Sequence, residues 1–268
     1  MGDATETSAQ ALARLYDIDL VDDPGDLDLY RALARRTGGP ILELGVGTGR
    51  LAVPLAAEGY DVTGIDIDPA VLARARLRAA GRGPEAASRL ELVEADLLGL
   101  RAVGQPRFRL AFIALNSLML LGSWRDQRAA VRVLAEHLAP GGVAAADLWL
   151  PDADDLARFD GRLILEYPRT DPETGRLVTK IAAAAHDAAT QAVQLTTIYE
   201  EGRPGEPALR WLREDRLRLV SADELRHFAE DAGLVVETVA GSYDLEPLEA
   251  GSQRAILIAA KPDPLSLV

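Results

Sequence analysis

The sequence predicts an α/β fold in which a mostly parallel sheet is interrupted, after its fifth strand, by an antiparallel β insertion. Three observations lead to this prediction. Up to Leu150, five strand patterns alternate with helix patterns, which is typical of parallel strands joined by right-handed crossovers. The first strand runs directly into a turn with glycines at alternate positions. From 162 to 219 the helical period disappears and strand-like runs follow one another.

Composition places the chain among ordinary globular proteins. Its 268 residues are 48% hydrophobic and 26% charged, with a net charge of -13. Phosphate contacts need clustered Lys and Arg, so this acidic balance argues against a nucleic-acid partner. The sequence contains no cysteine, which excludes disulfides and thiolate metal sites. No cluster of carboxylates and histidines has metal-ligand spacing either, so no metal is expected.

The chain also lacks the signals of membrane insertion and export. No stretch is long and apolar enough to span a bilayer, and the first residues lack the basic and apolar regions of a signal peptide. We therefore expect a cytoplasmic protein without a membrane partner. Abundant Ala and Arg suggest a bacterial source. The sequence is compatible with a homo-oligomer.

Two helices are expected before the first strand. Apolar residues at helical spacing predict helices over 8–16 and 27–36, separated by a turn around Pro24 and Gly25. The first strand, 41–44, ends in the glycine turn, and a further helix pattern covers 51–58. A strand that stops at glycines and opens a helix indicates a nucleotide-binding turn.

The glycine turn departs from the dinucleotide-binding pattern G-x-G-x-x-G. Gly45 and Gly47 fit the first two glycines, but Arg50 stands at the third place. Glu43 stands just ahead of the glycines, where a carboxylate would repel a pyrophosphate and hold a cationic group instead. S-adenosylmethionine carries an ammonium and a sulfonium, so its charge suits such a turn.

The segment Glu43-Leu44-Gly45-Val46-Gly47-Thr48-Gly49 resembles the first motif of the class I S-adenosylmethionine-dependent methyltransferases. The resemblance implies a seven-stranded, mostly parallel Rossmann-like sheet and S-adenosylmethionine as the cofactor. It also implies that Glu43 lies near the methionine end of the cofactor, with Gly45, Gly47 and Gly49 packed beneath it. In this family the helices before the first strand cap the cofactor pocket.

The second and third strands supply further cofactor candidates. Asp66 ends the strand 61–67, about 20 residues past Gly47, where a carboxylate can accept hydrogen bonds from both ribose hydroxyls. Asp66 and the adjacent Ile67 are therefore predicted to bind the cofactor. Asp68-Pro69 then starts a helix to about residue 80.

The strand 90–94 is followed by Asp96 and Leu97. An acid at this place resembles the adenine contact of the family, in which it accepts from the exocyclic amine while Leu97 edges the ring. Both residues are therefore predicted to contact the adenine.

The fourth strand, 109–115, delivers Leu115 and Asn116 to the edge where the first strand also ends. In the family this strand end lies beside the transferable methyl group, so Leu115 is predicted to contact the cofactor. Asn116 is a catalytic candidate that could orient an acceptor amine or hydroxyl. A turn residue bonded to its own backbone is the alternative for Asn116. A helix over 124–138 and a fifth strand over 143–149 follow.

The insertion is expected to cover the cofactor crevice as a lid, because it lies between the fifth strand and the next helix. It resembles the β insertion of small-molecule N-methyltransferases of the glycine and amino-sugar types, and should set the choice of acceptor. His186 in this segment is the candidate for a general base. Its four strand-like runs are 162–167, 177–185, 193–199 and 209–220.

The domain organisation follows from this pattern. Residues 1–150 and 221–268 should form the Rossmann-like core with its helical cap, and residues 151–220 the insertion. In the last part of the core, a helix from 221 to 233 precedes strands over 234–240 and 253–261, the last one antiparallel as in the family.

These features predict a methyltransferase that uses S-adenosylmethionine and acts on a small molecule. An amine acceptor needs only to be neutral and correctly aimed, whereas a hydroxyl needs a general base, so the absence of an evident base favours nitrogen. Three alternatives stay open: a nicotinamide-dependent oxidoreductase, which Glu43 and Arg50 disfavour; a non-catalytic S-adenosylmethionine-binding module; and transfer of another group, such as aminopropyl, from a related cofactor.

Overall fold

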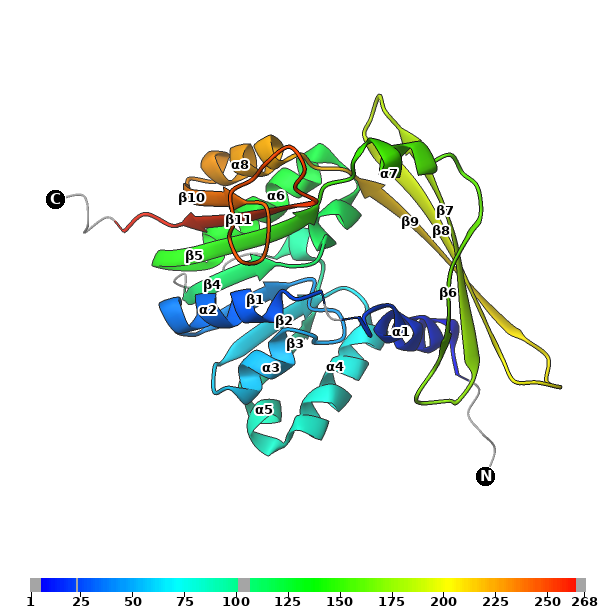
Figure 1. Ribbon diagram of the computed structural model, residues 1–268. Coiled ribbons are helices and arrows are strands. Elements are labelled where there is room, and N and C mark those ends of the chain that lie inside the picture. The colour runs from blue at the N-terminus through cyan, green and yellow to red at the C-terminus, as the bar shows by residue number, and fades with distance from the viewer. Residues whose placement is uncertain (1–5, 23, 101–106, 264–268) are drawn as a thin grey trace. The chain divides into compact units, whose positions relative to one another are not determined.

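The computed structural model describes residues 6–22, 24–100 and 107–263, which divide into two compact units (Figure 1). The seven-stranded unit spans 24–150 and 219–268, and the four-stranded unit spans 1–23 and 151–218. One sheet is mostly parallel and the other antiparallel, so the predicted fold class is confirmed. Among the described residues, no helix has the length and apolarity needed to cross a membrane.

The seven-stranded sheet has the order β10-β11-β5-β4-β1-β2-β3. Its pairs β1–β2, β2–β3, β1–β4 and β4–β5 are parallel, and β11 is antiparallel to both β5 and β10. All strands except β11 therefore end at one edge, called here the strand-end edge. The bounds are β1 Ile41–Leu44, β2 Val62–Asp66, β3 Leu90–Glu94, β4 Phe108–Ile113, β5 Leu138–Trp149, β10 Val235–Ala240 and β11 Arg254–Ala260.

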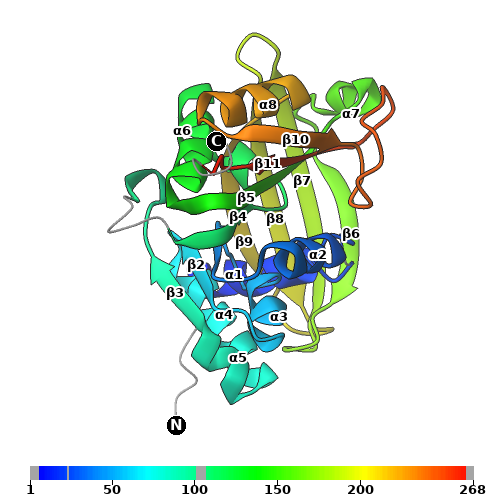
Figure 2. The same cartoon turned by 90° about the vertical axis from the view of Figure 1, so that its left-hand side faces the viewer.

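Helices cover both faces of this sheet. The helices α2, α3 and α4 lie on one face, and α6 and α8 pack together on the other (Figures 1 and 2). The core between the layers buries large side chains completely, among them Tyr30, Phe112 and Ile256. The bounds are α2 Leu27–Thr37, α3 Ala52–Ala57, α4 Pro69–Arg82, α5 Pro84–Arg89, α6 Trp124–His137 and α8 Ala222–Asp231, with short 3₁₀ turns η1 Leu97–Gly99 and η2 Ser117–Leu121.

Helix starts follow the capping residues of the sequence. Asp68 accepts a 2.8 Å hydrogen bond from the Ala70 N–H ahead of Pro69, as the sequence predicts for α4. Ser221 and Glu224 form a capping box at the start of α8, where the sequence predicts a helix to begin. Because these caps depend on residues one turn apart, local sequence is enough to place them.

Three elements differ from the expectation. Strand β5 begins at Leu138 rather than at 143, so the residues between the expected helix and the expected strand form an irregular strand start. Gly141 takes a φ of 72° there, and the pairing of β4 with β5 shifts register between Phe108 and Leu110. The short helices α5 and α7 were not expected, since each contains only six residues and too few apolar positions to show a period.

The four-stranded unit is an antiparallel sheet of order β6-β7-β8-β9, which agrees with the expected insertion. Helix α1 packs on this sheet through Leu15 and Ile18, which contact Val178 and Tyr199. The bounds are α1 Ser8–Asp19, α7 Ala153–Arg158, β6 Ile164–Thr170, β7 Leu177–Asp187, β8 Ala192–Gly202 and β9 Leu209–Arg218.

Buried ion pairs also connect α1 to this unit. The Arg14 side chain is only 4% exposed and forms ion pairs with Asp171 and, at 3.0 Å, with Glu201. The sequence predicts instead that the first helix belongs to the helical cap of the core. Asp171 and Glu201 lie 157 and 187 residues away from Arg14, so local sequence could not reveal these two ion pairs. The domain boundaries themselves stay a prediction.

Candidate active site

Glu43 is a buried carboxylate in the middle of the seven-stranded sheet. It stands in β1 between Gly64 of β2 and Phe112 of β4, and only 4% of the residue is exposed. The Ala52 N–H donates a hydrogen bond to its carboxylate, but its Oε2 atom has no partner. Burial raises the pKa of Glu43 to about 8, against the opposing charge of Arg50.

Arg50 forms an ion pair with another acid, Asp26. Its guanidinium donates to both oxygens of Asp26, at 2.5 and 2.6 Å, and Asp26 is completely buried just before α2. A bidentate pair of this kind largely cancels its own charge. Arg50 therefore acts on Glu43 only through its charge, and its ion pair is with Asp26. The sequence carried no signal for this ion pair, because the two partners are 24 residues apart.

The raised pKa of Glu43 predicts a pH-dependent stability. The native state keeps this proton up to about pH 8, whereas an unfolded glutamate releases it near pH 4.5. Ionisation of the buried Glu43 carboxyl therefore lowers the free energy of unfolding as the pH rises from about 4.5 to about 8. We expect the melting temperature of the wild type to fall, relative to Glu43→Gln, between about pH 5 and pH 8. A constant difference between the two melting curves over this range would contradict the assignment.

The glycine turn is held by the backbone of β2. The N–H groups of Gly45 and Val46 donate to the Ile65 carbonyl at 2.8 and 2.9 Å. Gly45 has a φ of 75°, and a Cβ there would come within 3.1 Å of the Ser117 side chain. Gly47 has a φ of 53°, so both positions use the backbone freedom of glycine.

Gly49 is explained by helix packing. Its φ is 77°, and a Cβ would lie 2.8 Å from Val53 Cγ2 and 3.2 Å from Ala75 Cβ. The residue is therefore needed where α3 and α4 approach the turn. The spacing of the motif cannot distinguish this role from close approach to a ligand.

Gly49→Ala should consequently destabilise the protein by about 2–4 kcal/mol, because it combines backbone strain with overpacking. Gly59→Ala is the matched control, since Gly59 has a φ of 97° but open space around it. We expect the control to lose only about 1–2 kcal/mol, from strain alone. Urea denaturation measures both variants, and equal losses would contradict the packing role.

Asp66 connects β2 to the glycine turn. Its carboxylate accepts from the Gly47 N–H at 2.8 Å and from the Asp68 N–H at 3.0 Å. The adjacent Ile67 is 68% exposed. Asp66 therefore fixes the turn even without a ligand, which the sequence did not predict.

Asp96 and Leu97 follow β3 at the same edge. Asp96 is exposed, and its Oδ1 accepts from the Leu98 N–H at 2.9 Å, which starts η1. Leu97 is half-buried. Since β3 neighbours β2, these two residues and Asp66 lie on adjacent strand ends.

The turn after β4 is strained and anchored. Leu115 and Asn116 have φ values of 48° and 66°, an uncommon left-handed pair for residues other than glycine. The Leu115 N–H donates to Asp147 Oδ1 at 3.0 Å, and Asn116 Oδ1 accepts from the Trp149 N–H at 2.5 Å. The amide oxygen of Asn116 thus accepts a hydrogen bond from the protein itself, and its NH₂ group has no hydrogen-bond partner among the described residues.

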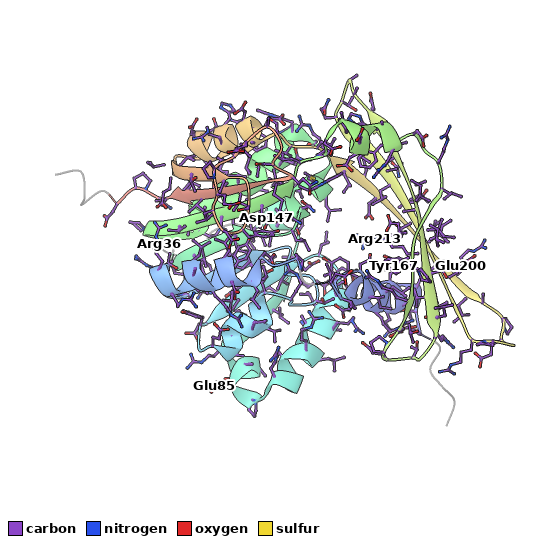
Figure 3. The ribbon with its side chains drawn as sticks, in the orientation of Figure 1. Arg36, Glu85, Asp147, Tyr167, Glu200 and Arg213 are labelled. Atoms are coloured by element: carbon purple, nitrogen blue, oxygen red, sulfur yellow. The ribbon has the colours of Figure 1, made fainter. Side chains whose placement is uncertain are left out.

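Asp147 is the anchor of this turn and of its surroundings (Figure 3). Only 1% of the residue is exposed, and burial raises its pKa. Besides Leu115, the hydroxyls of Tyr30 and Tyr243 donate to it at 2.6 and 2.9 Å. Arg254 Nη1 lies 3.6 Å from Asp147 Oδ2. Its two tyrosine partners are 96 and 117 residues away, so local sequence could not reveal this role of Asp147.

His186 lies in β7, in the four-stranded unit. Its backbone N–H donates to the Phe159 carbonyl at 3.1 Å, and its side-chain Nε2 is buried without a hydrogen-bond partner. The two catalytic candidates of the sequence, Asn116 and His186, therefore belong to different units. The cofactor candidates all belong to the seven-stranded unit and follow strands that end at one edge, with Glu43 near the end of β1 itself.

Comparisons with known proteins identify methyltransferases as the proteins that this chain is similar to. A family profile described as "Methyltransferase domain" matches residues 41–142. The chain is 29% identical to the cypemycin N-terminal methyltransferase of a Streptomyces species over 229 residues, which is 85% of this chain and 84% of the relative.

Two solved structures are also similar. The CcbJ methyltransferase of Streptomyces caelestis superimposes with a TM-score of 0.72 at 25% identity, covering 88% of this chain and 95% of that one. CalS10 of Micromonospora echinaspora, an amino pentose methyltransferase solved with S-adenosylmethionine bound, has a TM-score of 0.63 at 21% identity and covers 95% and 92%.

Proposed function

The chain belongs to the class I S-adenosylmethionine-dependent methyltransferases, and from this premise we propose that it methylates an amine nitrogen of a small molecule. Its cofactor is S-adenosylmethionine. The observation that carries the assignment of the site is the buried Glu43 carboxylate with its unpartnered Oε2 atom, next to the glycine turn. The acceptor nitrogen is supported by the relative named for N-terminal methylation.

The residues of the strand-end edge fit the cofactor. Glu43 would bind the ammonium of the methionine part, because a buried carboxylate with a free oxygen gains most from a cationic partner. Gly45 and Gly47 would let the backbone pass beneath the cofactor. Gly49 would keep the turn packed against α3 and α4. A pyrophosphate would meet the Glu43 carboxyl here, which disfavours a nicotinamide cofactor.

The remaining cofactor contacts follow the neighbouring strands. Asp66 would accept from the ribose hydroxyls while it holds the turn, and Ile67 would cover the sugar from its exposed position. Asp96 and Leu97 would bind the adenine amine and ring edge. Leu115 would contact the cofactor at the end of β4, beside Asn116.

The chemistry favours nitrogen. The bound cofactor supplies an electrophilic methyl group, and a neutral amine needs no base to accept it. Asp147 does not serve as a base, since Leu115, Tyr30 and Tyr243 all donate to its carboxylate. Asn116 would orient an oxygen of the acceptor through its NH₂ group, and His186 stays the candidate base for a hydroxyl acceptor.

A screen of small amines for release of S-adenosylhomocysteine tests the proposal. We expect turnover with an amine and a product heavier by one methyl group in place of a hydrogen. Turnover with hydroxyl acceptors alone would overturn the assignment to nitrogen, and a larger mass gain would indicate transfer of another group. Calorimetry with NADH should show no binding under conditions where S-adenosylmethionine binds.

Cofactor binding should also release a proton from Glu43. With a pKa of about 8, this carboxyl is mostly protonated at neutral pH, and an ammonium partner favours the ionised form. Calorimetry in buffers of different ionisation enthalpy should therefore detect release of about one proton at pH 7. The Glu43→Gln variant should bind more weakly and release markedly less. Identical proton release in both proteins would place the ammonium elsewhere.

A further inference from the structure

The four-stranded sheet is covered by α1 on one side. Val178 and Tyr199 point to that side, where α1 packs on them (Figure 1). Figure 3 shows Tyr167 and Arg213 on the same side as α1, and Glu200 on the other. Because side chains alternate along a strand, every second residue of these strands points to the side opposite α1.

An apolar row crosses that opposite side from one edge strand to the other. Ile181 of β7 pairs with both Leu165 of β6 and Ile198 of β8, and Ile198 pairs with Leu212 of β9. Residues directly opposite one another share a face, and Ile198 precedes Tyr199, so the row points away from α1. Its ends, Leu165 and Leu212, are 61% and 56% exposed, and its two isoleucines are half-buried. Contiguous exposed apolar surface of this kind marks an interaction site, and the side that carries the row is called here the open face.

Opposite charges flank the apolar row along β9. Arg210 and Glu214 stand two residues before and two residues after Leu212, so they share its face and both are exposed. Arg210 forms an ion pair with Glu200 on its own side of the row, whereas Glu214 pairs with no residue in the described part of the chain. About 13 Å of strand separates Arg210 from Glu214, so they cannot pair with each other within one chain. A two-fold axis along the row would exchange the two flanks and bring Arg210 of one copy to Glu214 of a second.

The open face is large enough for a stable interface. Strands β7, β8 and β9 contain 11, 11 and 10 residues. With strands about 4.8 Å apart and about 3.3 Å per residue, the sheet presents a flat area on the order of 600 Å². Two such faces would bury about 1,200 Å² together, which reaches the size of specific protein interfaces. An apolar centre with charged residues beside it is also the usual composition of such an interface.

We propose that two copies of this chain associate through their open faces, about a two-fold axis that runs along the apolar row. Each residue of the row then meets the same residue of the second copy, as a two-fold interface requires. Strand β9 lies over β9 of the second copy, in the aligned packing that two sheets adopt face to face. The pair of Arg210 with Glu214 forms twice. This association is independent of the proposed methyl transfer.

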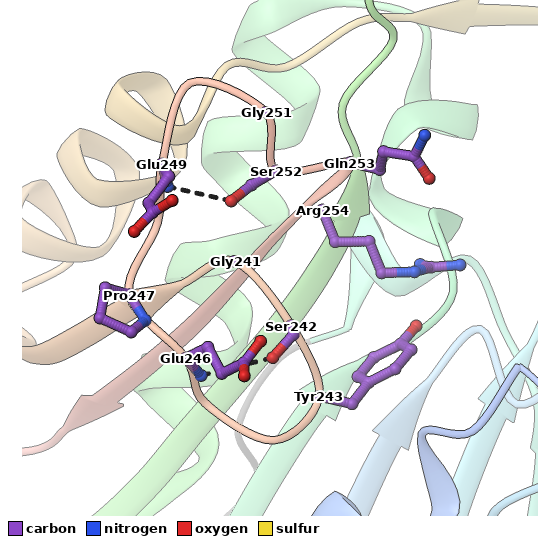
Figure 4. Close-up of a pocket in the computed structure, with 10 residues that line it drawn as sticks. All are labelled: Gly241, Ser242, Tyr243, Glu246, Pro247, Glu249, Gly251, Ser252, Gln253 and Arg254. Carbon is purple, nitrogen blue, oxygen red and sulfur yellow. Dashed lines mark hydrogen bonds between the residues drawn. The ribbon is translucent and has the colours of Figure 1, made fainter.

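Sedimentation velocity of the full chain over about 0.1–100 µM tests the association. Leu165→Arg places a charge in the row on β6, the edge strand farthest from β9. Val235→Arg is its control, because Val235 in β10 is also an apolar strand residue and is 58% exposed. The charge variants are Arg210→Glu, Glu214→Arg and the two together. Their control is Glu246→Arg, on the exposed loop between β10 and β11 (Figure 4), and melting curves confirm that every variant is folded.

We expect the wild type and both controls to form dimers with the same dissociation constant, and Leu165→Arg to associate about ten-fold more weakly or worse. Each single charge reversal should also weaken association about ten-fold, because like charges would then meet twice. The double reversal should recover most of the wild-type affinity. Since Arg210 and Glu214 cannot pair within one chain, this recovery requires contact between copies.

A wild type that stays monomeric over the whole concentration range would overturn the inference. A Leu165→Arg dimer as tight as the wild type would also overturn it, and would indicate that the β9 strands pair edge to edge instead. A double reversal that associates no more tightly than the single reversals would rule out the two-fold arrangement along the row.

Discussion

Asp147→Ala is expected to destabilise the protein by about 3–5 kcal/mol, the largest effect that we predict for a single substitution. The variant removes the common acceptor of the Tyr30 hydroxyl, the Tyr243 hydroxyl and the Leu115 N–H. Tyr30 is completely buried, so its hydroxyl would be left without water as a substitute partner. Urea denaturation followed by circular dichroism measures the loss.

Tyr30→Phe is the matched control for this prediction. It removes one donor but leaves Asp147 bonded to Tyr243 and Leu115, so we expect a loss of only about 1–2 kcal/mol. The left-handed turn at Asn116 should also loosen in Asp147→Ala, because its anchor is gone. A loss in Asp147→Ala no greater than that in Tyr30→Phe would show that the shared carboxylate is not the anchor.

Asp66→Ala is expected to weaken binding of S-adenosylmethionine by about 2–3 kcal/mol, the scale of charged hydrogen bonds to two hydroxyls. The structure adds a second cause. Asp66 also accepts from the N–H groups of Gly47 and Asp68, so the variant releases the glycine turn beneath the cofactor. Calorimetry measures the affinity, and the melting temperature without ligand reports the looser turn.

Two variants separate these contributions. Asp61→Ala removes an exposed acid near the start of β2 and should bind the cofactor as the wild type does. Asp66→Asn keeps an acceptor oxygen and the shape of the side chain, so its affinity should fall between those of Asp66→Ala and the wild type. Unchanged affinity in folded Asp66→Ala would refute the ribose contact.

The sequence by itself determined the elements and their class. Apolar periods and local signals, such as the glycines after β1 and the caps Asp68 and Ser221, depend on residues within one turn of each other, so they can be read without the fold. The motif around Glu43 likewise indicated the cofactor, because a strand that stops at a glycine turn limits what can bind there.

Only the tertiary structure decided which charged side chains are bonded to other residues of the chain. The pairs Asp26–Arg50 and Arg14–Glu201, and the bonds of Asp147 to Tyr30 and Tyr243, join residues far apart in the chain. Side-chain partners at such separations depend on how helices and strands pack, and no local pattern encodes them. For the same reason the sequence could name Asp66 and Glu43 but could not tell that Asp66 is bonded to two N–H groups of the turn, whereas Oε2 of Glu43 has no partner.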